Sequence, residues 1–204
     1  YVSLGLLDEA RKLSEETLRL NTKSAHLALS AGEIEEAAGN LDLAYIHYKS
    51  SHILAKHWVM PILKLASVSM TNGMYDEANL WLNKADKFDN NEILLASTKA
   101  EYYSLRNNLS AASKTLETLF ESGSADFQAY TASGIVELKK GNPDHALSKL
   151  IQATTLERNY SRAYAFLAVA HLHSGEPEVA FRQLEMAENL DPNDPLPNII
   201  ASQI

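Results

Sequence analysis

Residues 161–194 read SRAYAFLAVAHLHSGEPEVAFRQLEMAENLDPND. Tyr164 and Leu167 belong to an apolar face at helical spacing, which predicts an amphipathic helix in the first half of this segment. Gly175 then supplies the left-handed backbone that ends a helix. Pro177 follows two residues later, where the first turn of a new helix accepts proline. The segment therefore predicts two antiparallel helices joined by a tight turn.

The same pattern recurs along the whole chain with a period of 34 residues. One column holds alanine at every step, namely Ala10, Ala44, Ala78, Ala112, Ala146 and Ala180. A second column, five residues earlier, holds Gly5, Gly39, Gly73, Asn107, Gly141 and Gly175. A third column holds only small residues, namely Gly32, Ala66, Ala100, Gly134 and Ala168. The period continues without insertion or deletion and predicts an array of equal units.

The small columns mark the places where the two helices of a pair approach most closely. A single helix pair of this length cannot bury its own core, so stacking of neighbouring pairs must supply it. The sequence therefore predicts an all-α solenoid of antiparallel helix pairs.

The unit resembles the tetratricopeptide repeat (TPR) family. The residues of segment 161–194 that carry the resemblance are Tyr164, Leu167, Ala168, Gly175, Pro177, Ala180, Leu184, Ala187 and Pro192. Segments 25–58 and 93–126 match less well, because Ser51 replaces a later alanine and Asn107 replaces the turn glycine. The resemblance implies a right-handed superhelical solenoid with the first helix of each pair on its inner wall.

The period assigns the chain 1–204 to one TPR array with five full repeats and a partial repeat at each end. The full repeats are 25–58, 59–92, 93–126, 127–160 and 161–194, and the partial ones are 1–24 and 195–204. Because the chain opens partway through a repeat, we interpret it as a piece of a longer TPR protein.

The composition excludes several classes of function. Eighteen Lys and Arg stand against 26 Asp and Glu, a net charge of −8 that disfavours nucleic acid and anionic membranes. Without cysteine the chain has no disulfide and no cysteine-based metal site or nucleophile. No apolar run approaches the roughly 18 residues of a membrane span, so we expect no membrane insertion. Residues 1–5 lack a signal-peptide pattern, and both cytoplasm and periplasm stay open.

The polar residues predict no catalytic site, metal site or cofactor. His171 and His173 are two residues apart, so they point to different sides of a helix, and His171 is better interpreted as a packed core residue. His47, His52 and His57 also miss the spacing of helical zinc ligands. Acidic pairs such as Glu35-Glu36 are interpreted as solvated helix faces. We therefore expect a chain that is not an enzyme.

The resemblance implies ligand-facing residues at the second, fifth, ninth and twelfth positions of each repeat. The candidate peptide-binding residues are Met60, Leu63, Ser67, Leu94, Ser97, Glu101, Gln128, Thr131, Ile135, Arg162, Ala165 and Val169. The same positions also hold His26, Leu29, Glu33, Glu36, Met70, Ser104, Leu138 and Leu172. So much Met, Leu and Ile exceeds what a solvent-facing surface requires. The alternative is that many of these residues pack against the neighbouring repeat.

One known mode of TPR recognition is excluded. TPR co-chaperones that hold the acidic tails of heat-shock proteins use a clamp of Lys, Asn and Arg. Leu29, Glu33 and Leu94 stand at clamp positions here, and a shift by one repeat places Leu63 and Ser67 there. Glu33 would repel a carboxylate, so this clamp is absent.

The function predicted from these features is a scaffold that binds a protein or peptide in the groove and mediates assembly of a multiprotein complex. Bacterial envelope or exopolysaccharide systems contain long TPR proteins of this kind. The alternative is a substrate-docking array of a larger enzyme such as a glycosyltransferase, and the flanking sequence would discriminate between the two.

The two partial repeats also predict self-association. Residues 195–204 supply positions 1–10 of a repeat, and residues 1–24 supply positions 11–34. The apolar residues of the tail, such as Ile199 and Ile200, would then complete the head of the next copy in a head-to-tail contact. The competing outcome is fraying of both ends.

Overall fold

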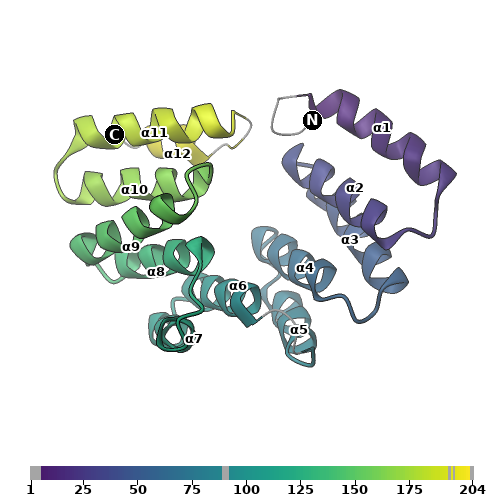
Figure 1. The fold of residues 1–204 in the computed structure, drawn as a ribbon, viewed down its shortest axis with the longest axis horizontal. Coiled ribbons are helices and arrows are strands. Elements are labelled where there is room, and N and C mark those ends of the chain that lie inside the picture. The colour runs from purple at the N-terminus through teal and green to yellow at the C-terminus, as the bar shows by residue number, and fades with distance from the viewer. Residues whose placement is uncertain (1–5, 89–91, 193, 195, 203–204) are drawn as a thin grey trace. The chain divides into compact units, whose positions relative to one another are not determined.

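The computed structural model describes residues 6–88, 92–192, 194 and 196–202, and the regular secondary structure in these residues is entirely α-helical (Figure 1). The helices are α1 (Leu7–Leu20), α2 (Ala25–Ala37), α3 (Leu41–Leu54), α4 (Val59–Thr71), α5 (Tyr75–Ala85), α6 (Glu92–Leu105), α7 (Leu109–Glu121), α8 (Phe127–Lys139), α9 (Pro143–Leu156), α10 (Ser161–His173), α11 (Pro177–Leu190) and α12 (Leu196–Ala201). The predicted all-α class is confirmed. The described helices are too short or too polar to form a membrane span.

The helices follow the predicted period. The second helices of successive pairs start 34 residues apart, at Leu7, Leu41, Tyr75, Leu109, Pro143 and Pro177. The two prolines occupy the first helical turn, where no intrahelical hydrogen bond from the backbone nitrogen is needed. The 34-residue repeat is therefore a repeat of structure as well as of sequence.

The turn between the two helices of a pair depends on a left-handed backbone. Gly73 and Gly141 have φ angles of 72° and 78°, in a region that residues with a Cβ rarely adopt. Asn107 takes the same place in its own repeat with a φ of 56°. Asparagine tolerates this conformation better than most residues, so it can replace the glycine. The predicted role of Asn107 is confirmed.

The small columns lie where helices touch, as predicted. The alanines at 44, 78, 112, 146 and 180 are fully buried. A Cβ added to Gly134 would lie 2.5 Å from Cγ of Leu150 on the paired helix, well inside the contact distance of two carbons. Gly32 is equally close to the ring of Tyr48. These contacts leave no space for larger side chains at the two glycines.

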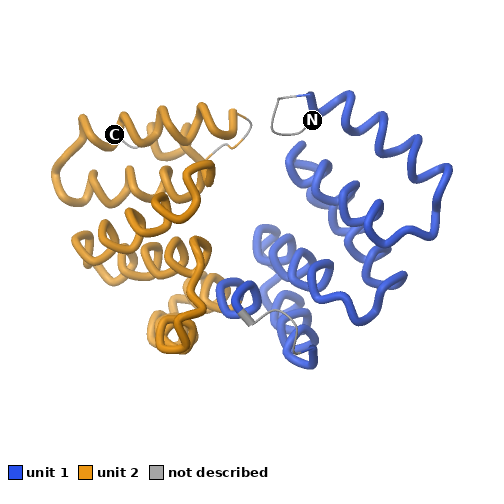
Figure 2. Tube along the Cα trace, viewed as in Figure 1, with its two compact units in different colours: residues 1–98 blue, residues 99–204 orange. Residues whose placement is uncertain are grey.

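The chain divides into two compact units, residues 1–98 and residues 99–204 (Figure 2). In unit 1, α2 packs on α3, α4 packs on α5, and both α1–α2 and α3–α4 are in contact. The core of this unit contains Leu29, Tyr48 and Leu65. The stacking of neighbouring pairs buries apolar faces that one pair alone would leave open.

Unit 2 has its own core. The pairs α8–α9 and α10–α11 pack closely, α9 contacts α10, and α12 lies against α10 and α11. One cluster contains Leu138, Leu150 and Leu167, and a second contains Leu184 and Ile200. In each unit, the side of the first helices that does not pack into the core faces solvent.

Candidate peptide-binding surface

The predicted ligand-facing residues fall into a buried group and an accessible group. All five residues at the fifth position are buried: Leu29, Leu63, Ser97, Thr131 and Ala165. At the twelfth position Met70, Ser104 and Leu138 are also buried, whereas Glu36 and Leu172 are half-buried. Their burial is what the alternative of packing between helices would produce.

The second and ninth positions remain accessible, and we call the five such residues of each unit its first-helix surface. In unit 1 these residues are His26, Glu33, Met60, Ser67 and Leu94. In unit 2 they are Glu101, Gln128, Ile135, Arg162 and Val169. His26 and Glu33 are exposed, and the other eight are half-buried. A partner that approaches the first helices meets these side chains.

Helix geometry explains why the two groups differ. Positions two and nine are separated by about two helical turns and lie on one stripe, as do positions five and twelve. The stripes are about 60° apart around the helix axis, because an α-helix has about 3.6 residues per turn. A neighbouring helix covers one stripe and leaves the other at the surface.

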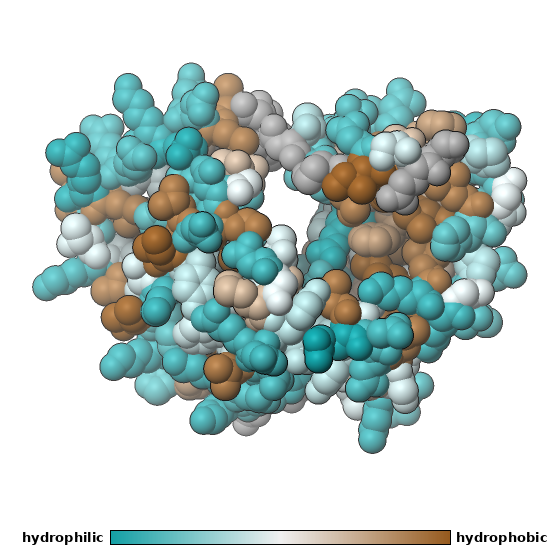
Figure 3. Space-filling view, turned by 180° about the vertical axis from the view of Figure 1, so that it is seen from behind, coloured by the Kyte–Doolittle hydropathy of each residue, from teal (hydrophilic) through white to brown (hydrophobic). Residues whose placement is uncertain are grey.

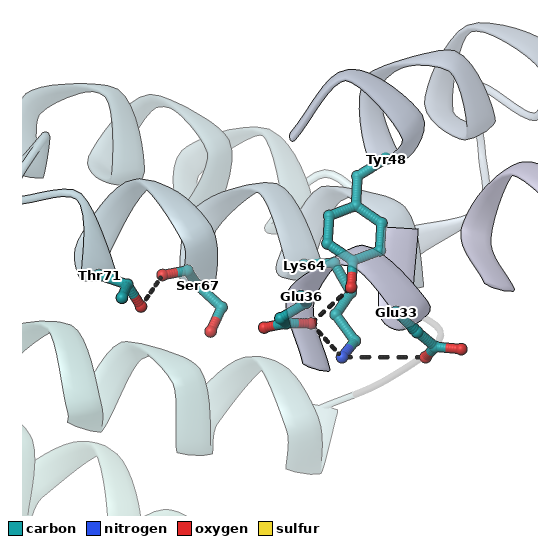
Figure 4. A network of polar contacts seen from close by, with 6 residues as sticks. All are labelled: Glu33, Glu36, Tyr48, Lys64, Ser67 and Thr71. Carbon is teal, nitrogen blue, oxygen red and sulfur yellow. Dashed lines mark hydrogen bonds and ion pairs between the residues drawn. The ribbon is translucent and has the colours of Figure 1, made fainter. Parts of the chain in front are cut away.

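A polar network joins three helices of unit 1 (Figure 4). Nζ of Lys64 on α4 lies 3.0 Å from a carboxylate oxygen of Glu36 and 3.8 Å from one of Glu33, both on α2. The buried hydroxyl of Tyr48 on α3 donates a hydrogen bond to Glu36. Burial, followed by the charge of Glu36, raises the pKa of Tyr48 far above its ordinary value. On the same surface the hydroxyl of Thr71 donates to the backbone carbonyl of Ser67 at 3.1 Å.

In unit 2 a charge pair links two first helices that are not neighbours in the repeat order. The guanidinium of Arg162 on α10 donates to the carboxylate of Glu101 on α6. The same guanidinium carbon lies 5.8 Å from the ring centroid of Phe166. Burial lowers the pKa of Arg162, but the charge and hydrogen bond of Glu101, together with the charges of Tyr160 and Asp194, outweigh it and the pKa is raised. Arg162 is therefore always a cation at this surface.

Glu35 is buried, although the sequence predicted that it would lie on a solvated helix face. It is 6% exposed and accepts hydrogen bonds from Nδ2 of Asn40 at 2.7 Å and from Nε of Arg11 at 3.0 Å. Burial alone raises the pKa of Glu35, but these hydrogen bonds outweigh it and the pKa is lowered. The prediction was wrong because a sequence pattern of adjacent acids does not reveal partners that lie 24 residues away, as Arg11 does.

The Glu35–Asn40 contact has counterparts that the sequence reasoning missed. In unit 2, Nδ2 of Asn142 donates to Glu137 at 2.9 Å. In the next repeat Nδ1 of His171 lies 2.7 Å from a carboxylate oxygen of Glu176, so here the acid is the later residue of the pair and not the earlier one. All three contacts join the eleventh and sixteenth positions of a repeat, across the turn between its two helices. A comparison of these two columns would have revealed complementary polar residues.

The described residues hold no cluster of three or more His, Asp or Glu that could bind a metal ion. The side chain of His171 is 15% exposed and packs beside Glu176, in line with its interpretation as a packed residue. The first-helix surface offers apolar side chains, hydrogen-bonding groups and paired charges.

Comparisons with known proteins agree with the repeat architecture. The family model described as tetratricopeptide repeat matches residues 131–195. A tetratricopeptide repeat protein from Parabacteroides merdae superimposes with a TM-score of 0.81 at 16% identity, covering 98% of this chain and 78% of the other. A chain of the APC/C heterotetramer Cut9–Hcn1 gives 0.70 at 17% identity, and this chain spans only 40% of it. YrrB, described as a TPR protein with an unusual peptide-binding site, gives 0.51 at 19% identity, with coverage of 96% of this chain and 100% of YrrB. None of the curated proteins matches the sequence.

Proposed function

Since the chain has the tetratricopeptide-repeat fold and residues 131–195 match the family model, we propose that it is a scaffold that binds a protein or peptide partner on its first-helix surface. Binding of this kind would join the partner to other components of a multiprotein complex.

The partly exposed apolar residues of the first-helix surface carry this proposal. Met60 in unit 1 and both Ile135 and Val169 in unit 2 are accessible on first helices. Val169 also packs against two core clusters of unit 2, so its position is held by the fold. Apolar residues held rigidly and rimmed by polar ones suit a binding surface.

The similar structures support the class of function and no specific partner. YrrB is described as having a peptide-binding site, and the Cut9–Hcn1 structure as a heterotetramer. At identities of 17–19% these proteins share the fold, and their partners are not carried over to this chain. Membership of a bacterial envelope or exopolysaccharide assembly, and the alternative of docking for a glycosyltransferase, stay predictions from the sequence.

A matched pair of isoleucines tests the proposal. Ile135 on α8 belongs to the first-helix surface, whereas Ile151 on the second helix α9 is 48% exposed and lies outside it. We expect Ile135→Glu to lower capture of a partner from extract by about tenfold or more, because the charge must be desolvated at the interface. Ile151→Glu is expected to leave capture unchanged. Quantitative mass spectrometry of the captured proteins measures both.

Equal losses for the two variants, or no loss for either, would contradict the proposed surface. Circular dichroism melting of both variants shows whether they remain folded. Leu63 is unsuitable for this test, because at 3% exposure a charge there would unfold unit 1 whether or not a partner binds.

Self-association through the terminal helices stays a prediction. In α12, Ile200 is 6% exposed and belongs to a core cluster, whereas Ile199 is 51% exposed. Ile199→Asp is therefore the suitable variant for sedimentation across a concentration series. A protein that is monomeric throughout, with or without the substitution, would exclude the contact.

A further inference from the structure

We infer that Glu101 masks Arg162 and thereby restricts the unit 2 part of the first-helix surface to uncharged, apolar segments of a partner. The inference rests on the proposed function and names the chemistry of what is bound. It makes Glu101 the residue that determines specificity at this surface.

The charged residues at the ligand-facing positions carry the inference. Apart from His26, whose ring lies tilted against that of Trp58, four of these twenty described positions are ionisable: Glu33, Glu36, Glu101 and Arg162. Each of the four is in an ion pair within its own unit, with Lys64 as the partner of Glu33 and Glu36. In unit 1 two carboxylates therefore share one ammonium, whereas in unit 2 the charges of Glu101 and Arg162 cancel one to one.

The pair in unit 2 is open to a partner. The side chain of Arg162 is 40% exposed and that of Glu101 is 32% exposed, so both remain in contact with solvent. An ion pair at this exposure contributes only about 0–1 kcal/mol to stability. Its main consequence is that it cancels two charges on a surface that otherwise consists of Gln128, Ile135 and Val169.

A charged partner side chain gains little from the Glu101–Arg162 pair. A carboxylate that approaches Arg162 meets Glu101, and the charge of Asp194 also acts on Arg162. An ammonium or guanidinium group that approaches Glu101 meets Arg162 instead. Either group would lose its hydration, and the opposite charge that it meets is already paired and cannot compensate for that loss. Apolar side chains lose nothing in this way and gain contact with Ile135 and Val169.

Selection from a random peptide library displayed on phage tests the inference with the intact chain. The wild-type protein is expected to enrich uncharged, apolar peptides. A synthetic peptide from this pool is expected to bind with a Kd that changes less than about twofold between about 0.05 and 0.5 M NaCl, because little charge is involved. Fluorescence anisotropy measures this Kd.

The variant Glu101→Gln is expected to enrich acidic peptides, because Arg162 then lacks its counter-charge. An acidic peptide from that pool should bind the variant about two- to fivefold more tightly than the wild type, the range that corresponds to one exposed ion pair. The gain should disappear in the double variant Glu101→Gln with Arg162→Gln. Glu117→Gln, an exposed residue on the second helix α7, is the matched control and should behave as the wild type.

Three outcomes would overturn the inference. Charged peptides enriched by the wild type, or identical pools for the wild type and Glu101→Gln, would refute the masking role while peptide binding itself stands. Failure of every protein to enrich any peptide would refute the proposed function, and the inference with it.

Discussion

Small side chains in the repeated columns determine how closely the two helices of a pair pack. Ala146 is fully buried and lies in a cluster with Leu138 and Leu150. Gly134 touches Leu150 so closely that even a methyl group would displace it. At the scale of single residues, stability therefore depends on volume at these positions more than on hydrophobicity.

We predict that Ala146→Leu lowers the free energy of unfolding by about 1–3 kcal/mol, because the extra atoms overpack a filled core. Gln152→Leu on the exposed side of the same helix α9 should change it by less than about 0.5 kcal/mol. Urea unfolding followed by circular dichroism measures both. Similar effects at the two positions would show that the contacts of α9 are assigned to the wrong face.

The helices of a pair are also connected by polar contacts at the turn. The pairs Glu35–Asn40 and Glu137–Asn142 place a carboxylate near the end of the first helix and an amide at the start of the second. Arg11 adds a bond from α1 to Glu35 on α2, so the same carboxylate connects neighbouring repeats. At the scale of elements, these bonds orient helices that apolar contact alone would allow to slide.

We predict a pH dependence for this contact. The folded chain lowers the pKa of Glu35 from its ordinary value of 4.5, so the stability that the carboxylate contributes is complete above that pH and is lost as the pH falls through the folded pKa. Glu35→Gln should therefore lower the free energy of unfolding by about 1–2 kcal/mol at pH 7 and by much less below about pH 3.

Urea unfolding at several pH values measures the difference between the variant and the wild type. Glu16→Gln on the exposed side of α1 is the control and should show no such dependence. A cost of Glu35→Gln that is the same at neutral and acid pH would mean that the ionised form of Glu35 is not the stabilising one.

Stacking of helix pairs also determines how far a local change spreads through the molecule. Within each unit neighbouring helix pairs are in contact, and the described core clusters lie within one unit or the other. At the scale of the whole molecule, opening of one unit need not open the other.

Hydrogen exchange of the Ala146→Leu variant tests this. We expect faster amide exchange in α8, α9 and α10, by roughly tenfold, and a change of less than about twofold in α1, α2 and α3, because those helices belong to unit 1, which has its own core cluster. Mass spectrometry of peptic fragments resolves the two regions. Uniform acceleration in all helices would indicate that the chain opens as a single cooperative unit.

The sequence by itself determined the class of fold, the period, the turn positions and the location of close helix contacts. These follow from local properties. Gly73 and Asn107 adopt backbone angles that few other residues tolerate, and Ala146 occupies a buried site that has no room for a larger side chain. Such requirements act within one repeat and recur with it, so a periodic sequence displays them directly.

Only the tertiary structure decided which of the residues predicted to face a ligand are accessible. Leu63 and Ile135 are both aliphatic residues on first helices, yet Leu63 is buried and Ile135 is accessible. The structure also paired Arg162 with Glu101, which lies 61 residues earlier in the chain. Exposure and long-range pairing depend on how neighbouring helices cover a face, and that coverage is a property of the stacked repeats rather than of any single one.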